Sequence, residues 1–253
     1  MSPATPTSPA VFSPVLTGMT YLTARERRLN IGRAIVALEQ DGRLGPRGSG
    51  PSGRPELIDE ASGYGVGIWS MNRAEWQLVD LAGHAFSLVG IPLYDTLGPN
   101  VVEYVINHSP LSIVFTASSH IPALLKVAPK CPSLRVIVSM DTLMEREGSV
   151  LRAWAETTGV ELWELPDFEV WGAKEGLKRK IQVRPPRPDQ TATISYTSGT
   201  TGNPKGVVLP FCRHSGGRRS IARSRQRARV GTARGHQLLA FGAHVSRTRV
   251  YRS

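Results

Sequence analysis

The sequence predicts an α/β fold in which helices flank a parallel sheet. Short runs of almost entirely apolar residues recur along the chain, and most are followed by a stretch whose apolar residues repeat at helical spacing. Strands that are apolar on both faces are typical of parallel sheets covered by helices on two sides. A chain of 253 residues with 40% hydrophobic content is long enough for one large domain or two small ones.

The first expected element is a helix over Tyr21–Gln40, preceded by a flexible lead-in over residues 1–19. Leucines and isoleucines of this stretch lie partly at helical spacing, and its arginines are expected to be solvated. Residues 42–55 are so rich in Gly, Pro and Ser that no regular element is expected there.

From residue 64 onward, strands and helices are expected to alternate. Asn72 is expected to cap the first helix of this series. A basic, Pro-rich connector over 178–188 separates the series from the last two strands. The expected strands are 64–70, 91–94, 111–116, 134–139, 160–165, 191–196 and 207–209, and the expected helices are 72–89, 99–107, 121–127 and 150–157.

The net charge of +11 belongs to one end of the chain. Residues 211–253 contain eleven arginines and no Lys, Asp or Glu, whereas the first 210 residues carry 20 basic and 20 acidic side chains. Residues 211–253 are therefore expected to form a disordered, Arg-rich tail. We favour the interpretation that a frameshift, a retained intron or a mispredicted exon begins near Pro210, since out-of-frame coding sequence of high GC content gives this composition. The alternative is a nucleic-acid-binding arm, although few aromatic residues are interleaved for base stacking.

Several classes of site and protein are excluded by composition. Cys131 and Cys212 are too far apart to indicate a disulfide framework or a metal cluster, and Cys131 is expected to be an inert buried thiol. His84, His108 and His120 are not at ligand spacing, so they are expected at the surface or in satisfied contacts, and no metal site is expected. No apolar run reaches the roughly 18 residues of a membrane span, and the first 13 residues lack the features of a secretory signal.

The most informative segment is ISYTSGTTGNPKG, at 194–206. Here a strand runs into a loop that contains two glycines, four hydroxyl side chains and a lysine. Glycines allow several backbone N–H groups to converge on phosphate oxygens, hydroxyls add donors, and the lysine adds a mobile positive charge. The spacing excludes the Walker-type loop. A flexible turn with an exposed lysine is the plain alternative to a phosphate site.

The segment resembles the phosphate-loop signature of the AMP-forming acyl and aryl adenylating enzymes, the acyl-CoA synthetase and luciferase superfamily, at every position from 194 to 205. Upstream, NRAEW, PLYDTLG and EYVINHS resemble pieces of long-chain fatty acyl-CoA synthetases, particularly fungal ones. The resemblance covers about 64–210. It implies that residues 20–210 are part of an AMP-binding domain, the incomplete first part of the large domain of such an enzyme.

The resemblance implies a ligase that uses ATP with Mg²⁺ to convert a fatty acid to an acyl adenylate, releases pyrophosphate and transfers the acyl group to CoA. The implied partners are fatty acid, ATP and CoA, with no specific nucleic acid and with peripheral membrane association left open. The implied location is intracellular, and the resemblance does not distinguish between the cytoplasm, the peroxisome and the surface of the endoplasmic reticulum. The residues implied to hold the β- and γ-phosphates are Thr197, Ser198, Gly199, Thr200, Thr201, Gly202 and Lys205.

The resemblance stops at about residue 210. Enzymes of this kind carry an adenine-binding segment, a ribose-binding aspartate, a hinge and a C-terminal domain with a catalytic lysine, and residues 211–253 match none of these. We therefore expect this chain to be an inactive fragment of such a ligase, with no catalytic residue of its own. The alternative is a basic protein that binds nucleic acid through its Arg-rich tail.

Overall fold

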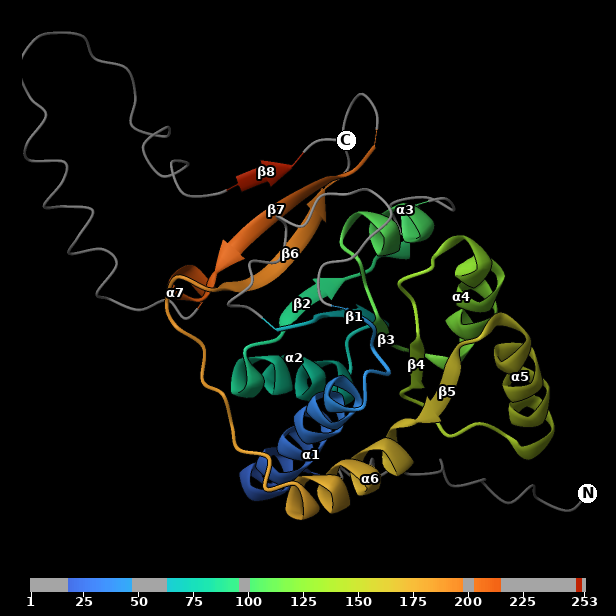
Figure 1. Cartoon of the computed structure of the whole chain (residues 1–253), viewed down its shortest axis with the longest axis horizontal. Coiled ribbons are helices and arrows are strands. Elements are labelled where there is room, and N and C mark those ends of the chain that lie inside the picture. The colour runs from blue at the N-terminus through green and yellow to red at the C-terminus, as the bar shows by residue number, and fades with distance from the viewer. Residues whose placement is uncertain (1–17, 47–62, 96–100, 198–202, 215–248, 252–253) are drawn as a thin grey trace, which may run out of the picture.

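A single mixed sheet organises the part of the chain that the structure describes. The structure is a computed structural model, and it describes residues 18–46, 63–95, 101–197, 203–214 and 249–251. The strands are β1 (Gly65–Trp69), β2 (Val89–Pro92), β3 (Ile113–Thr116), β4 (Val136–Ser139), β5 (Glu161–Glu164), β6 (Thr191–Thr197), β7 (Lys205–Pro210) and β8 (Arg249–Tyr251). Their order in the sheet is β5-β4-β3-β1-β2-β6-β7-β8 (Figure 1).

Neighbouring strands from β5 to β6 are parallel, and only β7 and β8 add antiparallel pairs. The expected α/β class with a mostly parallel sheet is therefore confirmed. Because β6 is parallel to β2, its carboxyl end lies at the same edge of the sheet as the carboxyl ends of β1 to β5. We call this edge the carboxyl edge.

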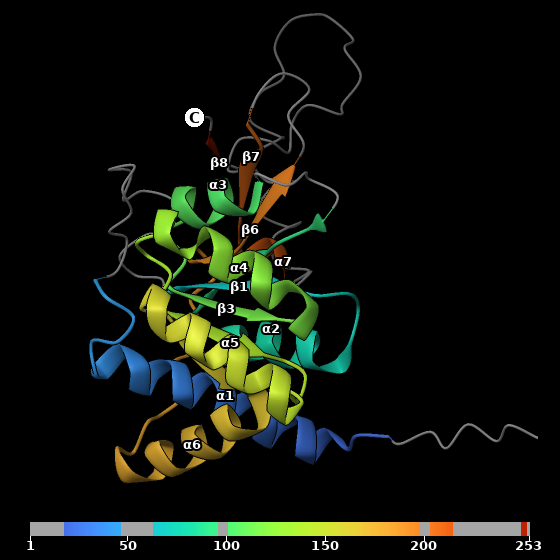
Figure 2. The same ribbon diagram turned by 90° about the vertical axis from the view of Figure 1, so that its right-hand side faces the viewer.

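Helices cover both faces of the sheet (Figures 1 and 2). One face packs against α1 (Tyr21–Gln40), α2 (Ala74–Phe86) and α6 (Leu165–Lys178), and the other against α3 (Val101–His108), α4 (Ile121–Val127) and α5 (Glu145–Thr158). Short helices complete the described elements: η2 (Ser118–His120), η3 (Ala128–Lys130) and α7 (Phe211–His214).

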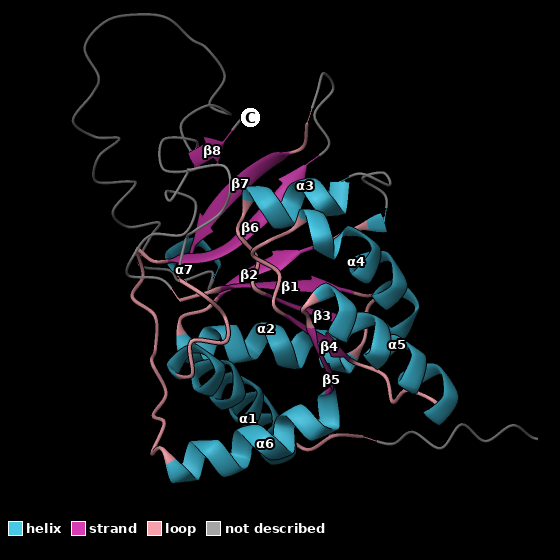
Figure 3. Ribbon diagram, turned by 45° about the vertical axis from the view of Figure 1, so that its right-hand side comes forward, coloured by secondary structure: helices cyan, strands magenta, loops and turns pink. Residues whose placement is uncertain are grey.

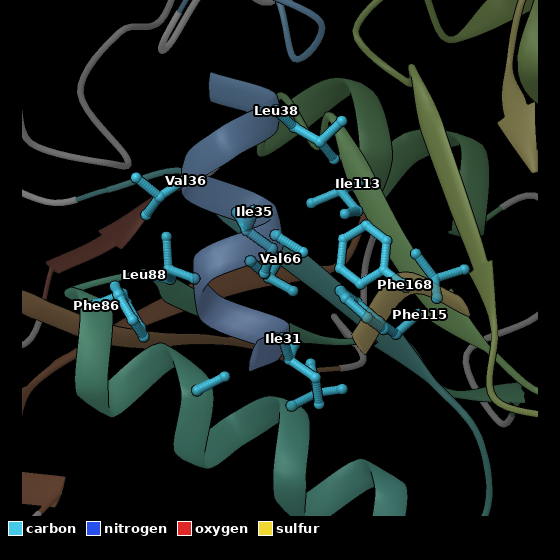
Figure 4. Packing of buried hydrophobic residues seen from close by; sticks show 14 of the residues in the cluster. Ile31, Ile35, Val36, Leu38, Val66, Phe86, Leu88, Ile113, Phe115 and Phe168 are labelled. Atoms are coloured by element: carbon cyan, nitrogen blue, oxygen red, sulfur yellow. The ribbon is translucent and has the colours of Figure 1, made fainter. Parts of the chain in front are cut away.

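Alternating side chains of the strands divide the core into two apolar clusters. In β3, Ile113 and Phe115 join the cluster under α1, α2 and α6, while Val114 joins the cluster under α3, α4 and α5. All three are fully buried. Figure 4 shows the first cluster, in which Phe168 of α6 lies beside Phe115. This burial on both faces explains why central strands such as β3 and β4 are almost entirely apolar.

The packing of α1 against α6 depends on a glycine. A Cβ placed on Gly172 would lie 2.1 Å from the carbonyl oxygen of Asn30, so no larger residue fits while the helices stay this close. Along the same contact, Arg27 of α1 and Glu169 of α6 form an ion pair at 2.9 Å. The first helix has the expected bounds, and the Thr20 hydroxyl caps it by accepting a hydrogen bond from the Thr23 N–H.

Several expected boundaries are wrong, and the largest shifts concern α2, β2 and α5. The N-cap of α2 is Arg73 rather than Asn72, and the helix ends at Phe86 because Ser87 takes the left-handed conformation, with φ at 57°. Because the helix ends before Val89, this residue can pair with Gly65. The second strand therefore runs over Val89–Pro92 rather than 91–94. In the same way, α5 begins at Glu145, five residues before the expected position.

The sequence pattern does not predict the helix α6, although Pro166 and Asp167 in its first turn are ordinary signals of a helix start. Its glycines, Gly172 and Gly176, weaken the helical pattern in the sequence because glycine has a low helix propensity. Both face α1, where added side chains would meet Asn30 and Arg33. The residues that obscure the helix are thus the ones that its packing requires.

Two expected irregular stretches are only partly described. Of the loop expected over 42–55, residues 42–46 form a turn with Gly42 and Gly45 at positive φ, and the rest lies outside the described residues. Within the expected tail over 211–253, Phe211–His214 form α7 and Arg249–Tyr251 pair with β7. Regular structure therefore continues at least to residue 214, and the remainder of the tail lies outside the described residues, as do residues 1–17.

Candidate functional site

The motif that the sequence analysis singled out forms a hairpin at the carboxyl edge of the sheet (Figure 3). Its residues 194–197 end β6, and Lys205 begins the antiparallel strand β7. The pairing is regular from Thr193 to Thr197, after a register shift between Thr191 and Thr193, and it places Thr197 directly opposite Lys205. We call Thr197 and Lys205 the base of the hairpin, because the loop between them starts and ends at these residues.

The base of the hairpin brings a hydroxyl and an ammonium group to the same face of the strand pair, because directly opposed residues of an antiparallel pair share a face. Thr197 is exposed and Lys205 is half-buried, so both side chains are accessible. Of the seven residues implied to bind phosphate, the structure places these two together. Ser198, Gly199, Thr200, Thr201 and Gly202 lie outside the described residues.

The donor set at the base of the hairpin suits the phosphates of ATP with Mg²⁺. An ammonium group neutralises phosphate charge, and a hydroxyl can donate to a phosphate oxygen or coordinate a hard cation. Carboxylates, which would repel phosphate, are absent from the described residues of the hairpin. In the described part of the chain, no three His, Cys, Asp or Glu side chains are grouped so that they could hold a metal ion by themselves.

A second place at the carboxyl edge, between β1 and β3, is filled by side chains. Between β1 and β3 the strand order reverses, because β2 lies on one side of β1 and β3 lies on the other. In doubly wound sheets this reversal commonly leaves a crevice for ligands. Here the Trp69 and His120 rings stack at a centroid distance of 4.3 Å, with 9° between their planes. Asp95 accepts a hydrogen bond of 2.8 Å from the Trp69 indole and lies 3.2 Å from His120 Nε2. The stacked rings leave the hairpin as the better candidate for a phosphate site.

Next to this stack, Asp141 joins elements from both faces of the sheet. Its carboxylate accepts a hydrogen bond from the Ser118 N–H at 2.8 Å and pairs with Arg73, the N-cap residue of α2, at 2.6 Å. Burial of the Asp141 carboxyl raises its pKa, but the Ser118 N–H and the Arg73 guanidinium outweigh that effect and hold the pKa below its usual range. Asp141 is therefore a structural carboxylate that stays ionised at neutral pH.

Three residues beside the hairpin were not predicted from the sequence to support the site. Tyr104 and His108 of α3 contact Tyr196, which directly precedes the base of the hairpin, and His108 Nδ1 lies 2.8 Å from the Tyr196 hydroxyl oxygen. His108 is a buried, hydrogen-bonded histidine, in line with the expectation that it is satisfied. The signal available in the sequence was the four-residue spacing of Tyr104 and His108, which places both on one helical face.

The cysteine expected to be inert is confirmed as such. Cys131 is 1% exposed, and burial raises the pKa of its thiol to about 11, so the reactive thiolate is scarce at neutral pH.

Among the described helices, none combines the length and the apolarity that crossing a bilayer requires.

Comparison with known proteins assigns a family. A family model described as AMP-binding enzyme matches residues 60–227. A peroxisomal acyl-CoA ligase of Penicillium brevicompactum is 37% identical over 226 residues, which are 88% of this chain and 29% of that protein. The peroxisomal long chain acyl-CoA synthetase 6 of Arabidopsis thaliana is 40% identical over 147 residues, which are 58% of this chain and 20% of that protein.

The fold matches as well. The adenylation domain of a carboxylate reductase from Mycobacterium chelonae superposes with a TM-score of 0.60 and 20% identity, over 77% of this chain and 28% of that chain. The chain thus spans less than a third of the length of these relatives. With a family model that covers most of the described sheet and a matching fold, the chain belongs to the family of AMP-binding enzymes.

Proposed function

We propose that this chain supplies the phosphate-binding part of an ATP-dependent long-chain fatty acid–CoA ligase. The observation that carries the proposal is the pairing of Thr197 with Lys205 at the base of a hairpin on the carboxyl edge of the sheet. The names of the relatives, acyl-CoA ligase and long chain acyl-CoA synthetase, support the substrate class. Residues 20–210 then form a partial AMP-binding domain.

In this proposal, the hairpin acts on the leaving group of the first step. A fatty acid carboxylate attacks the α-phosphorus of ATP, the bond between the α-phosphorus and the bridging oxygen breaks, and the electron pair leaves on pyrophosphate. Lys205 would neutralise charge that builds up on that pyrophosphate, and the Thr197 hydroxyl would orient one of its oxygens. Ser198, Gly199, Thr200, Thr201 and Gly202 would complete the phosphate contacts. Mg²⁺ would supply further charge neutralisation, with a loop hydroxyl near it.

Lys205 is assigned to charge neutralisation and not to proton transfer, because the step transfers no proton. Holding the phosphates in one orientation lowers the barrier by positioning the reactants, which is the main contribution that a protein makes to phosphoryl and adenylyl transfer. The chain itself offers no further group for catalysis within the described residues of the hairpin, and we assign none.

Binding of phosphates by the full chain tests the proposal directly. Titration calorimetry with Mg²⁺–ATP and with Mg²⁺–tripolyphosphate should give binding to the wild-type chain, and Lys205→Ala should weaken it about tenfold or more, since a charge-assisted contact is lost. Lys174→Ala, which removes an exposed lysine from α6, is the matched control and should bind like the wild type. No binding to the wild type, or equal binding to both variants, would overturn the proposal.

A second assay tests the ligase step itself. Fatty-acid-dependent exchange of labelled pyrophosphate into ATP would show that the chain carries out adenylation. Absence of exchange alongside intact phosphate binding would agree with the inactive fragment expected from the sequence.

The relatives named above as peroxisomal favour the peroxisome among the three compartments expected for the protein.

The alternative of nucleic-acid binding rests on the eleven arginines of residues 211–253. Such a tail would bind phosphates without sequence preference, and its affinity would fall steeply with salt. Deletion of residues 211–253 would then abolish binding to duplex DNA at low salt, whereas unchanged binding would remove this alternative.

A further inference from the structure

A cluster of three rings, two of them buried and one partly buried, lies beside the base of the hairpin. Tyr104 and His108 come from α3, and Tyr196 comes from β6. Tyr104 and His108 stack at 5.1 Å with 19° between their planes, and Tyr104 meets Tyr196 edge-on at 6.4 Å and 89°. His108 is 5% exposed and Tyr196 is 3% exposed, so water does not compete for the hydrogen bond between them.

The Tyr196 ring contacts both strands of the hairpin. Tyr196 is directly opposite Gly206, and a Cβ on Gly206 would lie 3.4 Å from Cε1 and Cζ of the ring. The glycine therefore leaves room for the ring to lie over β7. Because Tyr196 adjoins Thr197 and Gly206 adjoins Lys205, the ring is one residue away from each side of the base of the hairpin.

The polar contact does more than fill space. A phenylalanine ring would fill nearly the same volume without bringing a hydroxyl into an apolar cluster. Burial raises the pKa of the Tyr196 phenol well above its usual range, so the hydroxyl stays protonated. A buried hydrogen bond is directional, and the 2.8 Å contact with His108 therefore sets where the ring and the end of β6 lie relative to α3.

We propose that His108 is a positioning residue which acts through Tyr196 to hold Thr197 and Lys205 in the geometry that binds phosphate. The proposal rests on the proposed function, because it names what orients the same site. A site whose support is held in place loses less conformational freedom when the ligand binds, and it binds more tightly for that reason.

The experiment compares hydroxyl deletions in the full chain, with Mg²⁺–tripolyphosphate as the probe. Tyr196→Phe removes the hydroxyl that meets His108, and with it that hydroxyl's hydrogen bond with the Ser109 side chain, and keeps the ring over Gly206. His108→Leu removes only the contact with His108. Tyr104→Phe is the local control, because its buried hydroxyl makes no hydrogen bond with any residue the structure describes. Tyr64→Phe is the stability control, since it removes a buried hydroxyl that donates to the Gly45 carbonyl at 2.5 Å, near the opposite edge of the sheet.

We expect Tyr196→Phe and His108→Leu to weaken tripolyphosphate binding about fivefold, the effect of one net hydrogen bond. His108→Asn places an amide near the position of Nδ1 and should restore most of the affinity. Tyr104→Phe and Tyr64→Phe should bind like the wild type, although Tyr64→Phe should be as destabilised toward urea as Tyr196→Phe. A merely structural role would change urea stability in the His108 and Tyr196 variants without changing affinity.

The outcomes separate this inference from the function on which it rests. If the wild type binds tripolyphosphate, Lys205→Ala binds at least about tenfold more weakly, and Tyr196→Phe and His108→Leu bind as tightly as the wild type, the phosphate site stands and the positioning role is overturned. If the wild type does not bind, the proposed function is overturned first and this inference falls with it. If His108→Asn is as weak as His108→Leu, the hydrogen bond is not what positions the hairpin.

Discussion

The two faces of the sheet bury different kinds of contact. Under α1, α2 and α6, the core is closed by tilted and edge-on rings and by a glycine that lets two helices touch. Under α3, α4 and α5, the core also holds a polar pair, His108 and Tyr196, next to the base of the hairpin. The comparison teaches that the first face contributes mainly to stability, while the second links the helical layer to the candidate site.

The largest expected effect comes from the first face. Phe168 is fully buried and meets Phe115 edge-on at a centroid distance of 5.6 Å and Trp163 at 5.7 Å. Phe168→Ala should lower the free energy of unfolding by about 4 kcal/mol, and Phe168→Leu, which keeps most of the volume, by about 1 kcal/mol. Urea unfolding measures both. Folded Phe168→Leu should bind tripolyphosphate with the affinity of the wild type. Weaker binding would contradict the inference that the face under α1, α2 and α6 contributes mainly to stability.

A smaller loss is expected from crowding the contact between α1 and α6. Gly172→Ala should cost about 2–3 kcal/mol, because the added Cβ would meet the Asn30 carbonyl and the Ala34 side chain. Gly83→Ala in α2 is the matched control, since its Cβ would lie no closer than 3.5 Å to any neighbour. That control should stabilise the chain by about 0.5 kcal/mol through helix propensity. Equal urea midpoints for the two variants would contradict the close packing described above.

The smallest effect concerns Asp141, which joins elements from both faces. Its folded pKa lies below the unfolded value, so its contribution to stability is present above a pH of about 4 and is lost as the pH falls through the folded pKa. Because the side chain is one-third exposed, we expect less than about 1 kcal/mol. Asp141→Asn should be less stable than the wild type at pH 7, and the difference should shrink as the pH falls below 4. A difference independent of pH would mean that the charge does not matter.

The sequence predicted those elements whose signals are local. The first helix has a capping threonine and a long run of helix-forming residues, and its bounds are as expected. The loop motif predicts a candidate phosphate site for a similar reason, because hydroxyls, glycines and a lysine are adjacent along the chain. By contrast, α6 escaped prediction because Gly172 and Gly176 are favourable only in contact with α1, which lies more than 130 residues earlier.

The sequence alone determined the α/β class, the two-sided burial of the parallel strands and the segment that is predicted to bind phosphate, because each of these depends on adjacent residues. Only the tertiary structure decided that Thr197 opposes Lys205 on one hairpin, and that stacked rings fill the place between β1 and β3. It also decided that His108 reaches Tyr196 across 88 residues of sequence. Contacts of this kind follow from how strands and helices are ordered in space, which no local pattern of residues encodes.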